Sequence, residues 1–323
     1  MDLRGTTRRL APLAVSLLAA AACAHHAAGP AQPERPIDEL VEPNPDIAHR
    51  DLFYGVGGRA LVPRSDVAYH FVEKKTAGFS DNFVVTDPQG RQWNAKFGRE
   101  VKAEVAASRL MWAIGFYQEP IYYMKEWRIE EGGKETGPQP EARFRYDDPN
   151  WEKHGEWSWK SNPFVGTREF QGLIVMQILI NNWDLKTSNN ELYKIAKGSP
   201  ERRYVVKDIG QSFGRSVRIF LGSAGKIEDF LQRGFIREVN DGEVEFEYEP
   251  IILNWGVDRG LSVEDVLWTC HRLAQLSDEQ WSDAFRAAGY EDAEVAAFVQ
   301  HMKQKLQEGL ALEQRARSYG GLR

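Results

Sequence analysis

An apolar segment near the middle of the chain constrains the fold more than any other feature. Residues 167–182 are predicted to form a helix, and from Leu173 to Ile180 nearly every side chain in it is apolar. A helix that is apolar on all its faces belongs in the interior of a fold. The chain turns polar directly afterwards, at Trp183-Asp184-Leu185-Lys186-Thr187-Ser188-Asn189-Asn190. We therefore expect a buried helix that ends in a polar loop.

Three strands and a helix are predicted in the amino-terminal half. Residues 67–72, 82–86 and 92–97 have the composition of strands, and a turn signal rich in Asp, Pro and Gly separates the last two. Apolar residues at helical spacing over residues 100–114, closed by Gly115, predict a helix. The expected order is therefore strand, strand, strand, helix.

Two less regular segments lie between this half and the central helix. Residues 116–129 read as extended and aromatic-rich chain, whereas residues 130–162 are polar, contain glycine and are expected to be irregular. A boundary between two lobes is expected there. After the polar loop, residues 191–196 and 203–206 predict a hairpin that ends at Asp208-Ile209-Gly210.

The carboxyl-terminal part is predicted to be mainly helical. A hairpin at residues 235–248, around Asn240-Asp241-Gly242, comes first. Three helices are expected after it, with Ser262 and Ser277 as helix caps and the last helix near residues 294–312.

The amino terminus is typical of a bacterial secretion signal. Arginines at positions 4, 8 and 9 precede an apolar run at residues 11–22 that is too short to span a bilayer. The run ends at Cys23 and resembles a lipoprotein signal, in which cleavage exposes this cysteine for acylation. An ordinary cleavage site between small residues is the alternative. The pair Arg8-Arg9 also leaves the twin-arginine route open beside the general one.

Export, and a tether after the signal, are the expectations for the first 50 residues. We expect a protein of the periplasm or cell envelope, with a lipid anchor at Cys23 as its only membrane contact. Cys270 is the one other cysteine, so no internal disulfide is predicted once Cys23 is processed. Residues 23–50 are rich in Pro, Ala and acidic side chains and read as a flexible tether. The formal net charge of −6 and the lack of a long basic run argue against nucleic acid as a partner.

The polar loop and the segments around it resemble the protein-kinase-like superfamily. Asp184, Lys186 and Asn189 have the D-x-K-x-x-N spacing of a kinase catalytic loop, and Asp208-Ile209-Gly210 stands where D-F-G would. Lys96 ends the third strand, and Glu104 lies on the following helix, as the lysine and glutamate of kinases do.

The resemblance is to the atypical branches, which include the lipid-kinase-like, HipA-like and CotH-like families. The loop at residues 74–81 has one glycine, Gly78, where typical protein kinases have several. No histidine-arginine pair precedes Asp184, and the spacing from Lys96 to Glu104 is short. These departures separate the chain from ordinary serine/threonine kinases.

The resemblance implies an α+β, two-lobed kinase-like fold, with a small β-rich amino-terminal lobe that holds one helix and a larger, mainly helical carboxyl-terminal lobe. The expected division is a signal peptide at 1–22, a tether at 23–50, the first lobe at 51–130 and the second at 131–323.

The resemblance also implies a nucleotide site for ATP and Mg²⁺. Lys96 would contact the α and β phosphates, positioned by Glu104 or by Glu100 one turn earlier, and the loop with Gly78 would cover the phosphates. Asn189 and Asp208 would supply oxygen ligands to the metal.

The catalytic roles that the resemblance implies fall on the D-x-K-x-x-N loop. Asp184 would accept or orient the proton of the acceptor hydroxyl, and Lys186 would steady charge on the phosphoryl group in transfer.

Three functional interpretations stay open. In the first, the protein is an ATP-dependent phosphotransferase for an unknown hydroxyl acceptor. In the second, it is a catalytically inactive kinase-like envelope lipoprotein that serves as a binding or scaffold module for an envelope protein. The third is an unrelated envelope protein in which short motifs occur by chance.

Overall fold

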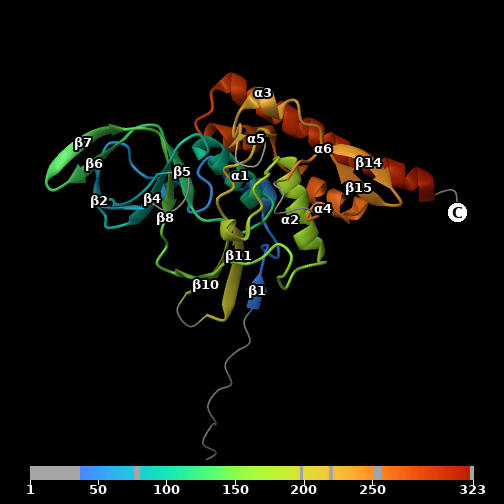
Figure 1. The fold of residues 1–323 in the computed structure, drawn as a ribbon, viewed down its shortest axis with the longest axis horizontal. Helices are drawn as coiled ribbons and strands as arrows, with labels where there is room; N and C mark the ends of the chain where they lie inside the picture. The colour runs from blue at the N-terminus through green and yellow to red at the C-terminus, as the bar shows by residue number, and fades with distance from the viewer. Residues whose placement is uncertain (1–36, 76–80, 197–198, 218–220, 251–255, 321–323) are drawn as a thin grey trace, which may run out of the picture. The chain divides into compact units, whose positions relative to one another are not determined.

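The largest sheet of the fold has seven strands, in the order β5-β8-β4-β3-β2-β6-β7 (Figure 1). The computed structural model describes residues 37–75, 81–196, 199–217, 221–250 and 256–320. The strands of this sheet are β2 (Ala68–Lys75), β3 (Asn82–Thr86), β4 (Gln92–Phe97), β5 (Ile121–Met124), β6 (Trp127–Glu131), β7 (Lys134–Gln139) and β8 (Ala142–Tyr146).

Strands β3 and β4 form a hairpin because the side chain of Asp87 satisfies the turn between them. Its Oδ1 accepts hydrogen bonds from the backbone nitrogens of Gln89 at 3.0 Å and Arg91 at 2.9 Å. Along β4, Trp93 and Ala95 are fully buried in an aromatic core that lies on one face of the sheet. Strand alternation therefore directs Asn94 and Lys96 to the opposite face.

The sheet extends well past the expected lobe boundary at residue 130. Strands β6 and β7 form an antiparallel hairpin, and β6 also pairs in parallel with β2. Strand β8 pairs with β4 and β5, so the prediction that residues 130–162 are irregular is wrong over this stretch. The physical reason is that Phe144 of β8 is buried in the aromatic core, while the neighbouring arginines face charged partners instead of water.

Helix α1 (Val101–Ala113) belongs to the main hydrophobic core and not to the core of the sheet. It contacts β5 and β8 on one side and α5 (Asp278–Arg286) on another, so nearly all its side chains are buried. Repeated alanines such as Ala103, Ala106 and Ala107 allow these neighbours to approach closely. A helix held from several sides is a rigid carrier for the charged residues it bears.

Helix α2 (Arg168–Leu179) is buried, as its apolar sequence predicted. Thr167 caps its amino terminus by accepting a hydrogen bond from the backbone nitrogen of Phe170 at 3.3 Å. Helix α4 (Val263–Leu273) packs against it at Gly172, where a Cβ atom would lie 2.3 Å from the Trp268 ring. Glycine at this position therefore lets the two helices touch.

The carboxyl-terminal helices α4, α5 and α6 (Asp292–Gly320) complete the main core. Ser262 and Ser277 form capping boxes with Asp265 and Gln280, which confirms the two predicted caps. The hairpin before them, β14 (Ile236–Asn240) and β15 (Glu243–Phe246), is also present. Among the described residues, no helix combines the length and apolarity needed to cross a membrane.

A four-stranded sheet corrects the expectation of a tether at residues 23–50 for its described part, residues 37–50. Its order is β1 (Ile37–Glu39), β11 (Glu201–Val206), β10 (Asn190–Ile195) and β9 (Trp151–Gly155). β1 pairs in parallel with β11, and Asp38 forms an ion pair with Arg202 at 2.6 Å. Leu40 and Ile47 are buried in the main core. Residues 37–50 are therefore part of the fold, since a few apolar side chains between prolines suffice to anchor them.

The remaining elements are short. They are the 3-10 helices η1 (Ile47–His49), η2 (Arg59–Leu61) and η3 (Thr187–Asn189), the two-stranded pair β12 (Ser216–Val217) and β13 (Leu221–Gly222), and α3 (Ile227–Phe230). The predicted secretion signal and Cys23 lie outside the described residues, as does Gly78.

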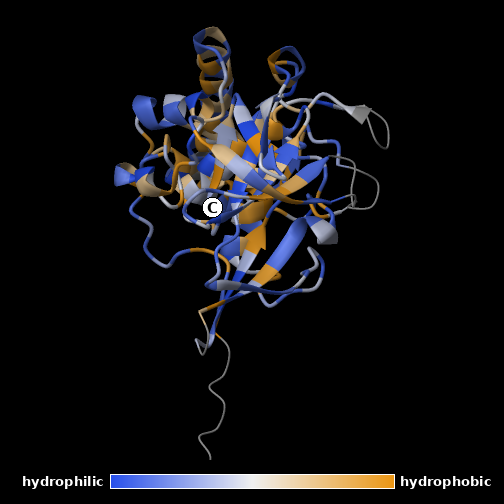
Figure 2. Ribbon diagram, turned by 90° about the vertical axis from the view of Figure 1, so that its left-hand side faces the viewer, coloured by the Kyte–Doolittle hydropathy of each residue, from blue (hydrophilic) through white to orange (hydrophobic). Residues whose placement is uncertain are grey.

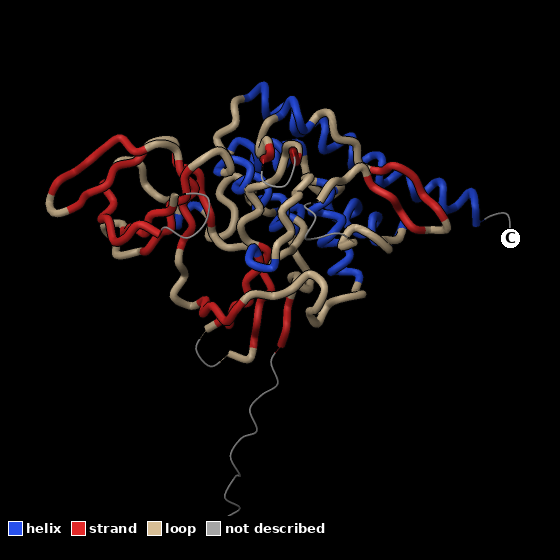
Figure 3. Tube along the Cα trace, viewed as in Figure 1, coloured by secondary structure: helices blue, strands red, loops and turns tan. Residues whose placement is uncertain are grey.

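The expected α+β class, with a β-rich amino-terminal part and a mainly helical carboxyl-terminal part, is confirmed. Figure 3 shows the strands of the large sheet gathered on one side and most helices on the other. Each part has its own hydrophobic cluster, and Figure 2 shows apolar residues concentrated in the middle of the fold. The site residues come from the segments where the two parts meet.

Candidate functional site

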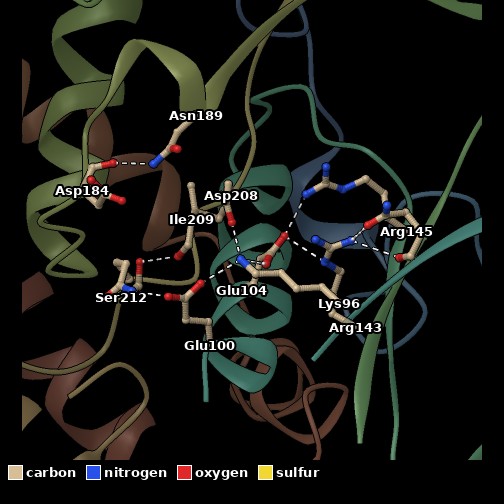
Figure 4. A network of polar contacts seen from close by, with 12 residues as sticks. Lys96, Glu100, Glu104, Arg143, Arg145, Asp184, Asn189, Asp208, Ile209 and Ser212 are labelled. Atoms are coloured by element: carbon tan, nitrogen blue, oxygen red, sulfur yellow. Dashed lines mark hydrogen bonds and ion pairs between the residues drawn. The ribbon is translucent and has the colours of Figure 1, made fainter. Parts of the chain in front are cut away.

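Lys96 is the centre of a cluster of buried charges (Figure 4). Its side chain is 5% exposed, and its Nζ atom lies 2.7 Å from Glu100 and 3.2 Å from Glu104. Asp208 makes a third ionic contact with the same nitrogen. Burial alone would lower the pKa of Lys96, but Glu104, Asp208 and Glu100 outweigh it and raise the pKa. Lys96 is therefore held as a cation.

Glu104 is the carboxylate on which the cluster converges. It is 1% exposed, and its Oε1 lies 2.9 Å from Arg143 Nε and 2.9 Å from Arg145 Nη2. Burial would raise the pKa of Glu104, but Arg143, Lys96 and Arg145 outweigh it and keep this pKa far below its ordinary value. The buried carboxylate is therefore ionised and surrounded by three cations.

The strand register explains why these side chains meet. Lys96 on β4 stands directly opposite Arg143 on β8, and Asn94 stands opposite Arg145. Paired residues share one face of a sheet, which here is the face away from the aromatic core. The side chain of Glu104 on α1 reaches the same place, and Arg143 Nη1 also donates to the Asn94 carbonyl oxygen at 3.2 Å.

Asp208 reaches Lys96 because of the turn that follows β11. Asp208 has a φ of +54°, in the left-handed region that side chains other than glycine seldom adopt. Gly210 then packs directly on the start of α1, where a Cβ atom would lie 2.7 Å from Glu100 Cβ and 3.1 Å from its carbonyl oxygen. Gln211 also donates to the Glu100 side chain. This loop therefore links the helical part to α1 and β4.

The hairpin of β10 and β11 brings Asn189 and Asp208 to the same end of a sheet. Asn190 is paired with Val206, so Asn189 lies beside Lys207, and Asp208 is the next residue. The backbone nitrogen of Lys207 donates to the Asn189 carbonyl at 2.9 Å. Figure 4 shows the Asn189 side chain directed towards Asp184 and the Asp208 side chain directed towards Lys96.

The loop from Asp184 to Asn189 is fixed by its own hydrogen bonds. Asn189 Nδ2 donates to the Asp184 carbonyl at 2.7 Å, and the Asp184 backbone nitrogen donates to Asn182 Oδ1 at 3.1 Å. Lys186 Nζ lies 2.8 Å from Asp184 Oδ2. Asp184 Oδ1 is buried and, within the described part of the chain, makes no hydrogen bond. One carboxylate oxygen of Asp184 is thus paired and the other is not.

The structure gathers the predicted residues into two neighbouring groups. Lys96, Glu104 and Asp208 form one, and both proposed partners of the lysine, Glu104 and Glu100, contact it. Asp184 with Lys186 and Asn189 forms the other. Their functional roles remain predictions.

Arg143 and Arg145 are site residues that the sequence reasoning missed. Both lie in a stretch that was expected to be irregular. The alternation of arginine with the aromatic residues Phe144 and Tyr146 is the signal that would have indicated a strand. The sequence has no signal for the burial of these two arginines, because a charged side chain is predicted to be exposed unless its buried partner is known.

The donor atoms present are suited to Mg²⁺. Asp208 is 46% exposed at its side chain, and the amide of Asn189 uses its nitrogen for Asp184, which leaves its oxygen as a ligand atom. Mg²⁺ prefers oxygen ligands and binds with one or two carboxylates together with substrate phosphates. Within the described ranges, no group of three or more His, Cys, Asp or Glu could hold a metal ion.

Comparisons with known proteins yield one structural similarity and no match in sequence. No protein-family model matches the sequence, and no curated protein matches it. Among solved structures, a proinflammatory kinase of Helicobacter pylori, CtkA, is similar with 11% sequence identity and a TM-score of 0.44. The match covers 76% of this chain and 94% of that chain. It assigns no activity, substrate or partner to the present protein.

Proposed function

We propose that this protein is a kinase-like phosphotransferase that uses ATP and Mg²⁺ to phosphorylate a hydroxyl group. The observation that carries the proposal is the contact of Lys96, on the sheet, with both Glu104 of α1 and Asp208 of the loop after β11. Phosphoryl transfer needs a fixed cation near the phosphates and an oxygen ligand for the metal on the facing side. We infer that this enzyme is exported to the cell envelope and is held there by a lipid anchor at Cys23.

In this proposal each charged residue has one task. Lys96, kept in place by Glu104, would bind the phosphate oxygens of ATP, and Asn189 and Asp208 would hold Mg²⁺, which neutralises phosphate charge when bound. The hydroxyl oxygen of the acceptor would form the new bond to phosphorus as the bond to ADP breaks. The hydroxyl proton would pass to the carboxylate of Asp184, which lies in the same loop as Lys186 and Asn189.

A second candidate function is an inactive binding module of the cell envelope. The observation in its favour is that three carboxylates, Glu100, Glu104 and Asp208, already saturate Lys96. ATP would have to displace Asp208 from this lysine before the metal and the phosphates bind. A module that never binds nucleotide would keep this self-paired arrangement.

The two candidates differ in their response to nucleotide. We would measure the melting temperature of the full chain with and without millimolar ATP and Mg²⁺, for the wild type and for Asp208→Ala. A ligand that binds only the native state raises the melting temperature, and at about 100 times its Kd the gain is about 2.7 kcal/mol. The phosphotransferase proposal expects a Mg²⁺-dependent rise in the wild type that Asp208→Ala loses.

A matched control separates loss of the site from loss of an ion pair. Asp66 pairs with Arg64 at 2.6 Å on the surface, and its side chain is 65% exposed. Asp66→Ala should keep the full nucleotide response. If the wild type does not respond, or if both variants respond as the wild type does, the nucleotide site is refuted and the binding module is favoured.

A further inference from the structure

Every second side chain of β15 points inward, and Tyr248, two residues after the end of the strand, continues this alternation. Val244, Phe246 and Tyr248 are buried, whereas the glutamates that alternate with them, at positions 243, 245 and 247, are exposed. Tyr248 is 6% exposed. This alternation places a phenol group deep in the helical part of the fold, beneath a hairpin whose outer face is solvated.

The phenol of Tyr248 contacts the loop that carries Asp184. Its hydroxyl donates a hydrogen bond to the backbone carbonyl of Asn182. The side chain of the same asparagine accepts from the Asp184 backbone nitrogen at 3.1 Å and donates to Gln177 Oε1 at 2.8 Å. Asn182 is therefore held by α2 at one end and by Tyr248 at another, and it in turn holds Asp184.

The tyrosine remains a donor over the whole physiological pH range. Burial, and then the negative charges of Asp258 and Asp184, raise its pKa well above the ordinary value. Hydrogen bonds connect the phenol of Tyr248 to Asp184 through Asn182.

We propose that Tyr248 is a positioning residue that fixes Asp184 through Asn182, and that it links the β14–β15 hairpin to the acceptor side of the site. The catalytic part of this inference rests on the proposed phosphotransferase function. The positional part, that the phenol restrains the Asp184 loop, does not depend on turnover.

The test compares Tyr248→Phe with a matched control, Tyr69→Phe. Tyr69 is fully buried, and its hydroxyl donates to the Arg64 carbonyl at 3.0 Å, far along the chain from Asp184. Both variants lose one hydrogen bond from a buried phenol to a backbone carbonyl. Hydrogen exchange at the Asp184 amide should become about tenfold faster in Tyr248→Phe, in line with the loss of one such bond, and stay unchanged in Tyr69→Phe.

Kinetics give the second measurement. Tyr248→Phe should lower kcat by about tenfold through misplacement of Asp184, while the KM for ATP stays at its wild-type value because the Lys96 cluster is intact. A change in KM with unchanged kcat, or equal exchange in the two variants, would overturn the proposal. If the wild type has no turnover, the proposed function and the catalytic part fail together, and the exchange rates alone decide the positional part.

Discussion

Replacing Glu104 with glutamine should destabilise the protein more than any other change of one charge in the cluster. The substitution keeps the shape of the side chain and removes its negative charge. Lys96, Arg143 and Arg145 would then be three cations without the carboxylate on which they converge. Glu104 is 1% exposed, so water cannot replace the lost partner.

The magnitude follows from the burial. Removing one partner of a buried ion pair costs about 3–5 kcal/mol, because the remaining charge is left uncompensated. At about 2.1 cal/mol/K of unfolding entropy per residue, such a loss lowers the melting temperature of a domain of this size by about 5–8 °C. The matched control is Glu135→Gln, since Glu135 pairs with Arg128 at 2.7 Å but is 47% exposed. Exposed pairs contribute about 0–1 kcal/mol, so this variant should melt close to the wild type.

The assay is thermal unfolding of the wild type and both variants over a range of pH. The pKa of Glu104 is lower in the folded protein than in the unfolded chain, so its contribution is complete above pH of about 4.3 and is lost as the pH falls below that value. The difference in melting temperature between the wild type and Glu104→Gln should thus be constant from neutral pH to about 5 and should become smaller in acid. If Glu104→Gln has the same melting temperature as the Glu135→Gln control at pH 7, the reasoning is refuted.

Two further predictions concern the surroundings of the site. Gly210→Ala should lower stability by about 1–3 kcal/mol in denaturant unfolding, because the new Cβ would lie 2.7 Å from Glu100 Cβ; wild-type stability would contradict the close packing. Lys305 is buried against the Leu179 carbonyl, and burial first of all lowers its pKa to about 7. The unfolded chain therefore binds more protons than the folded protein between pH 7 and about 10.4, and wild-type stability should rise with pH there. In thermal unfolding, the stability of Lys305→Met should not show this rise with pH. If the stability of both proteins depended on pH in the same way, the assignment of the rise to Lys305 would be wrong.

Local signals account for what the sequence predicted well. The strands at residues 82–86 and 92–97 have the predicted bounds, and both flank a turn that the Asp87 side chain closes by itself. The helix at residues 101–113 and the capping boxes of the carboxyl-terminal helices also depend on neighbours within a few residues. Information of this kind is present in any short stretch of the chain.

The parts that the sequence did not predict depend on distant partners. Arg143 and Arg145 face inward only because Glu104 lies there, 41 residues before Arg145 in the sequence. Residues 37–39 form a strand only because β11 offers an edge to pair with. For the candidate site, the resemblance supplied the residues, but the order of chain segments could not indicate that Asp208 would contact Lys96.

The pairing of β1 with β11 also bears on the order in which the chain folds. Asp38 and Arg202, which form the ion pair across these strands, are 164 residues apart in the sequence. Contacts of such separation require a large loop to close and form late. The first described strand thus has no partner until most of the polypeptide has been made, and it would join last.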